Sequence, residues 1–150
     1  MKEKLRKELN KKGLLLPTNF NKLKFDRYEL EYNNEDNENY NHHLYIYRNN
    51  EKIKQISYLN NGKLYYEYNL KNGKLNGKQY GWYENGELWC EENYKDNEKD
   101  GKQYGWYENG ELHYEENWKD RKLDGKQYKW WSNGHLDYIW IYRNGERVEK

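Results

Sequence analysis

The residues best suited to chemistry in this chain are four histidines, one cysteine and two pairs of adjacent glutamates. His42 and His43 are neighbours, and neighbouring residues of a strand point to opposite faces, so a shared metal ion is not expected. Cys90 corresponds to Tyr114 in a second copy of the same segment, which argues against a nucleophile. The glutamate pairs, Glu91–Glu92 and Glu115–Glu116, are typical of a solvated strand. We therefore expect a protein without catalytic residues, a metal site or a cofactor.

The element that positions these residues is a repeat of 24 residues. Residues 77–100 read GKQYGWYENGELWCEENYKDNEKD, and residues 101–124 differ from them at 6 positions. A third copy occupies residues 125–148, and a weaker one occupies residues 53–76. A short fixed period predicts a modular structure in which each unit packs mainly on its neighbours.

Each repeat predicts a β-hairpin, with strands over Lys78–Tyr83 and Glu87–Tyr94. We expect a tight turn at Glu84-Asn85-Gly86, because Asn and Gly accept positive φ, and a looser turn over Asp96–Gly101. The predicted fold class is all-β: an elongated, single-layer antiparallel meander of about ten strands, with a short N-terminal helix.

Alternation along these strands assigns the side chains to two faces. One face is expected to carry an aromatic ladder of Tyr80, Trp82, Leu88, Cys90 and Tyr94. The opposite face is expected to carry Gln79, Gly81, Tyr83, Glu87, Trp89, Glu91 and Asn93. Gly81 and Gly105 are expected to leave room for an aromatic ring to lie across the backbone.

The residues before the repeats predict two smaller elements. Leu5 and Leu9, spaced i, i+4 in a lysine-rich stretch, predict a short helix. Alternation over Lys22–Tyr32 and His42–Arg48 predicts a hairpin that acts as a degenerate capping repeat. The chain then divides into a basic helical segment over 1–21, a hairpin over 22–52 and a repeat region over 53–150.

Composition restricts the class of protein. The net charge of +1 gives no general attraction to nucleic acid or to a membrane surface. No apolar run approaches the roughly 20 residues that span a bilayer, so we expect no membrane association and a cytoplasmic location. The 18 tyrosines and 7 tryptophans suit a thin sheet with two wet faces better than a large dry core.

The repeat resembles the MORN repeat, in the variant form found in bacterial YwqK-type antitoxins. The matching residues are the Gly-x-x-x-Gly-Trp-Tyr start at Gly77–Tyr83, the turn at Asn85–Leu88 and the Lys-Asp that leads into the next glycine. The resemblance covers about residues 53–148. It implies a β-hairpin repeat protein that acts as a scaffold or binding module, and it implies an antitoxin role for the variant form.

Aromatic residues near lysines and glutamates make protein binding the expected function. The candidate binding residues are Tyr83, Trp89, Tyr107, His113 and Trp131, with the acidic loop residues Glu35, Asp36 and Glu38. The leading interpretation is a non-enzymatic inhibitor that covers a protein target, either a toxin or a defence nuclease of the anti-CRISPR type. The alternatives are a self-associating MORN-type scaffold and a single-stranded nucleic-acid binder, and the abundant glutamates count against the latter.

Overall fold

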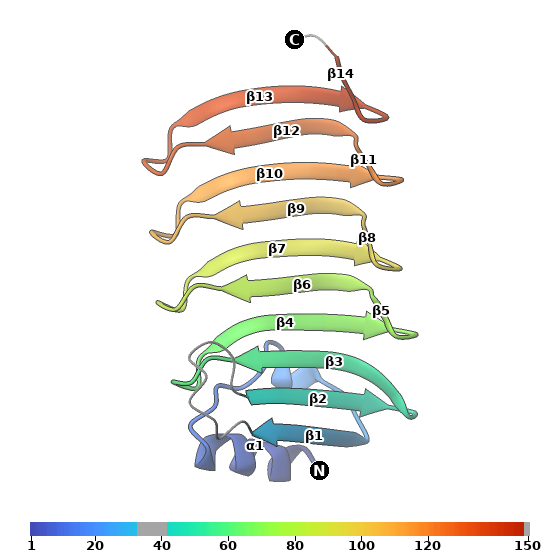
Figure 1. The fold of residues 1–150 in the computed structure, drawn as a ribbon, viewed down its shortest axis with the longest axis vertical. Helices are drawn as coiled ribbons and strands as arrows, with labels where there is room; N and C mark the ends of the chain where they lie inside the picture. Colours follow the sequence, from blue (N-terminus) through green and yellow to red (C-terminus); the bar gives the residue numbers. More distant parts are fainter. Residues whose placement is uncertain (33–41, 149–150) are drawn as a thin grey trace.

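The computed structural model describes residues 1–32 and 42–148, which form one continuous antiparallel sheet with a short helix at its N-terminal end (Figure 1). The strand order along the sheet is β1-β2-β3-β4-β6-β7-β9-β10-β12-β13-β14, and the short strands β5, β8 and β11 pair with β4, β7 and β10. The helical elements are α1 (Lys2–Lys11) and η1 (Phe20–Lys22). The strands are β1 (Arg27–Tyr32), β2 (His42–Arg48), β3 (Glu51–Tyr58), β4 (Leu64–Lys71), β5 (Lys74–Leu75), β6 (Gly77–Trp82), β7 (Leu88–Lys95), β8 (Glu98–Lys99), β9 (Gly101–Trp106), β10 (Leu112–Lys119), β11 (Lys122–Leu123), β12 (Gly125–Trp130), β13 (Leu136–Arg143) and β14 (Glu146–Val148).

This architecture confirms the expected fold class, with two corrections of detail. The sheet has 14 strands rather than about ten, because each connection between repeats contains a two-residue strand. The first strand begins at Arg27 rather than at Lys22, because Phe20–Lys22 forms a 3-10 turn whose Phe20 side chain is buried.

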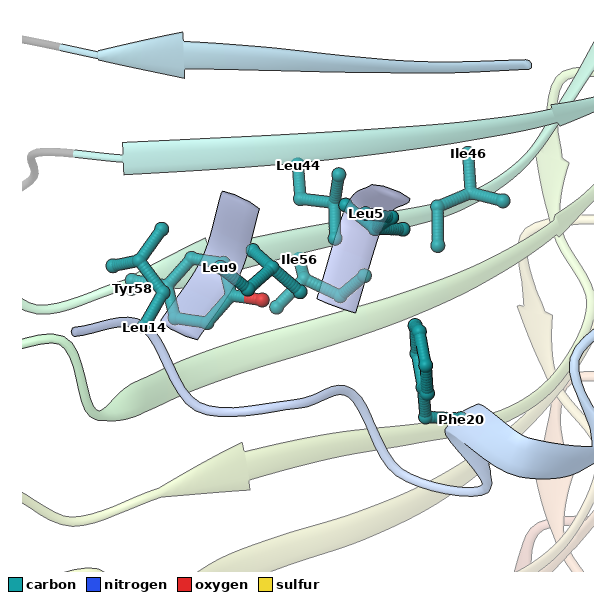
Figure 2. Close-up of a cluster of buried hydrophobic side chains, with 8 residues drawn as sticks. All are labelled: Leu5, Leu9, Leu14, Phe20, Leu44, Ile46, Ile56 and Tyr58. Carbon is teal, nitrogen blue, oxygen red and sulfur yellow. The ribbon is translucent and has the colours of Figure 1, made fainter. Parts of the chain in front are cut away.

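The compact core lies at the N-terminal end of the sheet. Leu5 and Leu9 are fully buried and project from one side of α1 onto β2 and β3 (Figure 2). The buried cluster consists of Leu5, Leu9, Leu14, Phe20, Leu44, Ile46, Ile56 and Tyr58. The i, i+4 leucines therefore form the predicted helix because they have an apolar strand surface to cover.

A buried carboxylate fastens the segment after α1 to the sheet. Glu67 on β4 is fully buried and accepts hydrogen bonds from the Thr18 amide (3.1 Å), the Thr18 hydroxyl (2.5 Å) and the Lys54 ammonium. Removal of one member of a buried ion pair typically costs about 3–5 kcal/mol, because the other charge is left without compensation. This contact fixes where the N-terminal segment crosses β3 and β4.

The two kinds of turn are the reverse of those expected. At Asp96 and Asn97 both φ angles are positive (52° and 71°), as a tight two-residue turn requires. In the other turn only Gly86 has positive φ (92°), and the Tyr83 amide donates to the Glu87 carbonyl (2.8 Å) across a longer loop. The Asn-Gly pair at 85–86 therefore makes the longer turn, and Asp96-Asn97 makes the tight one.

Each hairpin contains a bulge that the sequence pattern did not reveal. Gly81 pairs with Cys90, but the next pair is Trp82 with Leu88, so Trp89 is an extra residue on the second strand. The third and fourth repeats show the same shift at equivalent positions. A bulge moves every later side chain on its strand to the other face.

The bulge overturns the expected assignment of side chains to faces. Residues directly opposite each other in an antiparallel pair share a face. Tyr80 pairs with Glu91, so Glu91 and Asn93 share its face, whereas Cys90 and Tyr94 lie on the opposite one. The expected ladder of Tyr80 with Cys90 and Tyr94 is therefore wrong.

Candidate protein-binding face

One side of the repeat sheet carries a tyrosine–tryptophan pair from each of three repeats, and we call it the aromatic face. The two residues of a pair lie two positions apart on one strand, which places both rings on the same side. The ring centroids are 6.0, 5.8 and 5.6 Å apart in successive repeats, and all six side chains are half-buried. The aromatic face consists of Tyr80 and Trp82, Tyr104 and Trp106, and Tyr128 and Trp130.

The aromatic face continues the side of the sheet that α1 covers at the N-terminal end. Cross-strand pairs connect Ile56 to Glu67 and Glu67 to Tyr80, so the buried cluster and the first aromatic pair lie on one side. In the described chain, residues 1–26 and the turns are the parts outside the sheet, and α1 lies at the β1 end (Figure 1). Tyr80 on β6 borders a groove that the N-terminal residues Thr18 and Lys24 also line, whereas the aromatic rings from β9 onward face solvent rather than a second layer.

Ion pairs alternate with the rings along this face. Glu91 lies between Tyr80 and Tyr104 in the cross-strand register. Its carboxylate accepts from the Lys78 ammonium at 2.5 Å, and this hydrogen bond raises the pKa of Lys78. The next repeat has the same contact at 2.6 Å between Lys102 and Glu115. Exposed pairs of this kind add little stability, so their main effect is a regular charge pattern around the rings.

The opposite side carries three buried glutamines, Gln79, Gln103 and Gln127, and we call it the glutamine face. Between repeats only two residue pairs bridge directly, for example Cys90–Gly105 and Glu91–Tyr104. Beyond these two pairs, the Gln103 side chain connects the strands. Its Oε1 accepts a hydrogen bond from the Asn93 amide (3.0 Å), and its Nε2 donates to the Asn93 carbonyl (2.9 Å). Each glutamine thus replaces one backbone step in the ladder between repeats.

The expectation of an aromatic ring over Gly81 and Gly105 is confirmed. A Cβ atom at Gly81 would lie less than 3.0 Å from the Trp89 indole, and one at Gly105 would lie equally close to the Tyr114 ring. Over Gly81 the covering ring is Trp89, the bulge residue of its strand. Over Gly105 it is Tyr114, which follows the bulge residue His113. Cys90 is too small to cover Gly81, so Trp89 occupies that place.

Two of the predicted binding residues connect repeats. The Tyr83 hydroxyl donates to the Trp106 carbonyl (2.8 Å), and the Tyr107 hydroxyl donates to the Trp130 carbonyl (2.9 Å). Both side chains are half-buried, and burial is the first cause of a raised Tyr83 pKa. These contacts give the two tyrosines a structural role at the ends of the hairpins.

The other predicted binding residues are dispersed. Trp89 lies over Gly81 on the glutamine face, while the His113 and Tyr107 rings are in tilted contact with centroids 4.2 Å apart. Trp131 is 55% exposed at the last long turn. The acidic residues Glu35, Asp36 and Glu38 lie outside the described residues.

Among the described residues, the side chains that could serve as nucleophiles or metal ligands do not come together. Cys90 is fully buried, and burial raises the pKa of its thiol to about 12. Over residues 1–32 and 42–148, no three His, Cys, Asp or Glu side chains come together as metal ligands. The same residues include no helix long and apolar enough to cross a membrane.

Sequence reasoning missed the role of the glutamines and placed the aromatic ladder only in part. A signal for the first was present, because Gln recurs at the third position of each GKQY segment, 24 residues apart. A polar residue that recurs at a buried strand position of each repeat indicates a hydrogen bond that the repeats share.

Comparison with known proteins supports the similarity of the repeats to the MORN repeat variant. The family model for the MORN repeat variant matches residues 75–96, 99–120 and 123–144. No curated protein and no solved structure gives a significant match to the chain. The 24-residue offset between the matched segments equals the spacing of the hairpins in the sheet. Three consecutive segments of the chain are therefore similar to the MORN repeat variant, and such repeats suggest a repeat-based interaction or scaffold module.

Proposed function

We propose that the protein binds another protein through the aromatic face and acts by covering a functional surface of that partner. The observation that supports this proposal is the uncovered series of Tyr–Trp pairs, each beside a lysine and a glutamate. Tyrosine and tryptophan are enriched among the residues that dominate binding energy at interfaces. Because the rings are held on a sheet and stacked in pairs, little side-chain freedom is lost when a partner binds.

The partner that we propose is a toxin or a defence nuclease. The protein would then act as an antitoxin, an immunity protein or an inhibitor of the anti-CRISPR type, and its activity would be the loss of the partner's activity. The resemblance of the repeat to YwqK-type antitoxins supports this choice, as does a binding surface that needs no reacting groups.

A scaffold role is the second candidate, and the MORN-variant match supports it. Binding of single-stranded nucleic acid is disfavoured by the charge pattern. Glu91 and Glu115 lie between the tyrosines in the cross-strand register, so a phosphate backbone stacked along the face would meet carboxylates at each repeat.

The test begins with capture of the tagged protein and its partner from the native lysate, with and without nuclease treatment. The proposal predicts one stoichiometric protein partner that survives the nuclease. The activity of that purified partner should then fall in proportion to added protein and reach zero at equimolar ratio. A bound partner whose activity is unchanged would favour the scaffold role, and recovery of nucleic acid alone would contradict protein binding.

A further inference from the structure

A basic groove lies where the N-terminal segment crosses the sheet, at the border of the aromatic face. It has a volume of about 330 Å³ and is bounded by the segment after α1, by the end of β2 and by β3, β4 and β6. No aspartate or glutamate of the described chain lines it, whereas five of its lining residues are cationic: Lys22, Lys24, Arg48, Lys54 and Lys78. Small-molecule sites have volumes of about 300–1,000 Å³, so the basic groove has room for one small ligand.

Only two of these five cations are neutralised by a carboxylate within the described chain. Lys54 is paired with the buried Glu67, and Lys78 is paired with Glu91 at 2.5 Å. The cations that take part in none of the ion pairs of residues 1–32 and 42–148 are Lys22, Lys24 and Arg48. The basic groove therefore holds three uncompensated positive charges, although the net charge of the whole chain is only +1.

The fold holds these uncompensated cations near one another. Lys22 ends the 3-10 turn η1, which the buried Phe20 side chain anchors in the core cluster (Figure 2). Arg48 donates from Nε (2.9 Å) and Nη2 (2.6 Å) to the Lys24 carbonyl, so the end of β2 is tied to the N-terminal segment. An arginine has five N–H donors, and these two bonds use two of them. The others remain available to a ligand in the basic groove.

A phosphate group fits this charge arrangement better than a carboxylate does. A phosphate monoester carries a charge of about −1.5 to −2 at neutral pH and presents three strong acceptor oxygens, so it offsets most of the three positive charges. Lysine and arginine bind such oxygens through charge-assisted hydrogen bonds. Glu91 lies opposite Tyr80 in the cross-strand register, so a phosphate backbone that continued onto the aromatic face would meet a carboxylate. The basic groove therefore suits a small phosphate ester rather than a nucleic acid.

We propose that the basic groove binds a small phosphate-bearing molecule. Its phosphate lies against Lys22, Lys24 and Arg48, and the rest of the molecule lies beside Tyr80, the aromatic residue of the lining. Because Tyr80 also belongs to the first pair of the aromatic face, the bound molecule adjoins the protein-binding surface. This inference goes beyond the proposed function and does not depend on it, since the purified chain alone should bind the ligand.

Calorimetric titration of the full chain with inorganic phosphate, at an ionic strength held constant with chloride, tests the site. Phosphate should bind saturably at one site per chain, and the double variant Lys22→Gln/Lys24→Gln should weaken binding by about tenfold or more. Both lysines are exposed, so the fold should survive the change. Lys95→Gln/Lys119→Gln is the matched control, because it removes the same charge at the exposed ends of β7 and β10, and it should bind like the wild type. Binding that does not saturate, or equal weakening in both double variants, would overturn the proposal.

NMR chemical shifts provide the second measurement, with phenyl phosphate as the probe of a phosphate carried on a larger molecule. Phenyl phosphate should shift the amides of Asn19 and Leu23 and the ring signals of Tyr80, which all line the basic groove, and should leave the amide of Gln103 unchanged. Phenol, which lacks the phosphate, should shift none of them. Failure of phenyl phosphate to bind, or shifts spread along the whole sheet, would refute the proposal. Displacement of phosphate by an oligothymidine without a terminal phosphate would instead assign the groove to nucleic acid and contradict a small-ligand site.

Discussion

Gln103→Met should weaken the contact between two neighbouring repeats and lower the free energy of unfolding, while it leaves the volume of the buried side chain about the same. The Gln103 side chain bonds the Asn93 amide, the Asn93 carbonyl and the Gly101 carbonyl. The Asn93 carbonyl also accepts the Asp100 amide, so the substitution leaves one half-buried N–H, that of Asn93, without its partner. An orphaned buried donor costs about 1–3 kcal/mol, and each of the other two bonds contributes about 0.5–1.5 kcal/mol. The sum is about 2–6 kcal/mol, or roughly 4–24 °C in Tm for a chain of this size.

The assay is urea denaturation followed by tryptophan fluorescence, together with hydrogen exchange of the Asn93 amide. Gln55→Met is the matched control, because Gln55 is the equivalent residue of the first repeat but lies on β3, where the backbone pairs directly at this position with Tyr45 of β2 and Tyr68 of β4. The control should cost less than about 1 kcal/mol, since no backbone partner is lost. If the two variants lost equal stability, or if Asn93 exchange were unchanged in Gln103→Met, the glutamines would not bridge the repeats.

Three further predictions concern single sites in the repeats. Gly105→Ala should cost about 1–3 kcal/mol in chemical denaturation because its Cβ collides with Tyr114, and Tyr114→Ala should remove that penalty in the double variant. Cys90 should resist a thiol reagent at pH 8 in the native protein and react at the rate of unfolding, because burial raises its pKa to about 12; rapid labelling without denaturant would contradict its burial. Burial, and then the charge of Lys129, lowers the pKa of His113 in the folded protein, so the unfolded chain binds the proton at a higher pH. The free energy of unfolding should therefore fall as the pH drops below about 6.5, the unfolded pKa. This loss of stability should be smaller in His113→Gln.

The sequence was sufficient to predict the repeat architecture, because the signals for it are local. The 24-residue period, the turn residues and the alternation of side chains all act within one hairpin, so they identify strands at Gly77–Trp82 and Leu88–Lys95 to within a residue or two. The leucines of α1 were equally informative, since a helix with Leu5 and Leu9 on one side needs an apolar surface to cover.

The faces of the sheet were not predictable, because one bulge residue decides them. Nothing in Leu88-Trp89-Cys90 marks Trp89 as the extra residue, and its place depends on how its indole packs on Gly81 of the neighbouring strand. For the same reason, the sequence predicts binding residues other than those of the aromatic face. It predicts an exposed Tyr83 ring, but the Tyr83 hydroxyl donates to the Trp106 carbonyl of the next repeat, a contact that depends on the spacing between repeats.

The central claim is that the aromatic face binds a protein partner, and paired tryptophan variants test it most directly. Trp106 and Trp118 belong to the same repeat and are both half-buried, but they lie on opposite faces. In capture from native lysate after nuclease treatment, Trp106→Ala should lose the partner by about 30-fold or more, as expected for a residue that contributes at least about 2 kcal/mol to binding. Trp118→Ala should retain the partner. Equal retention by both variants, or loss only in Trp118→Ala, would contradict binding through the aromatic face.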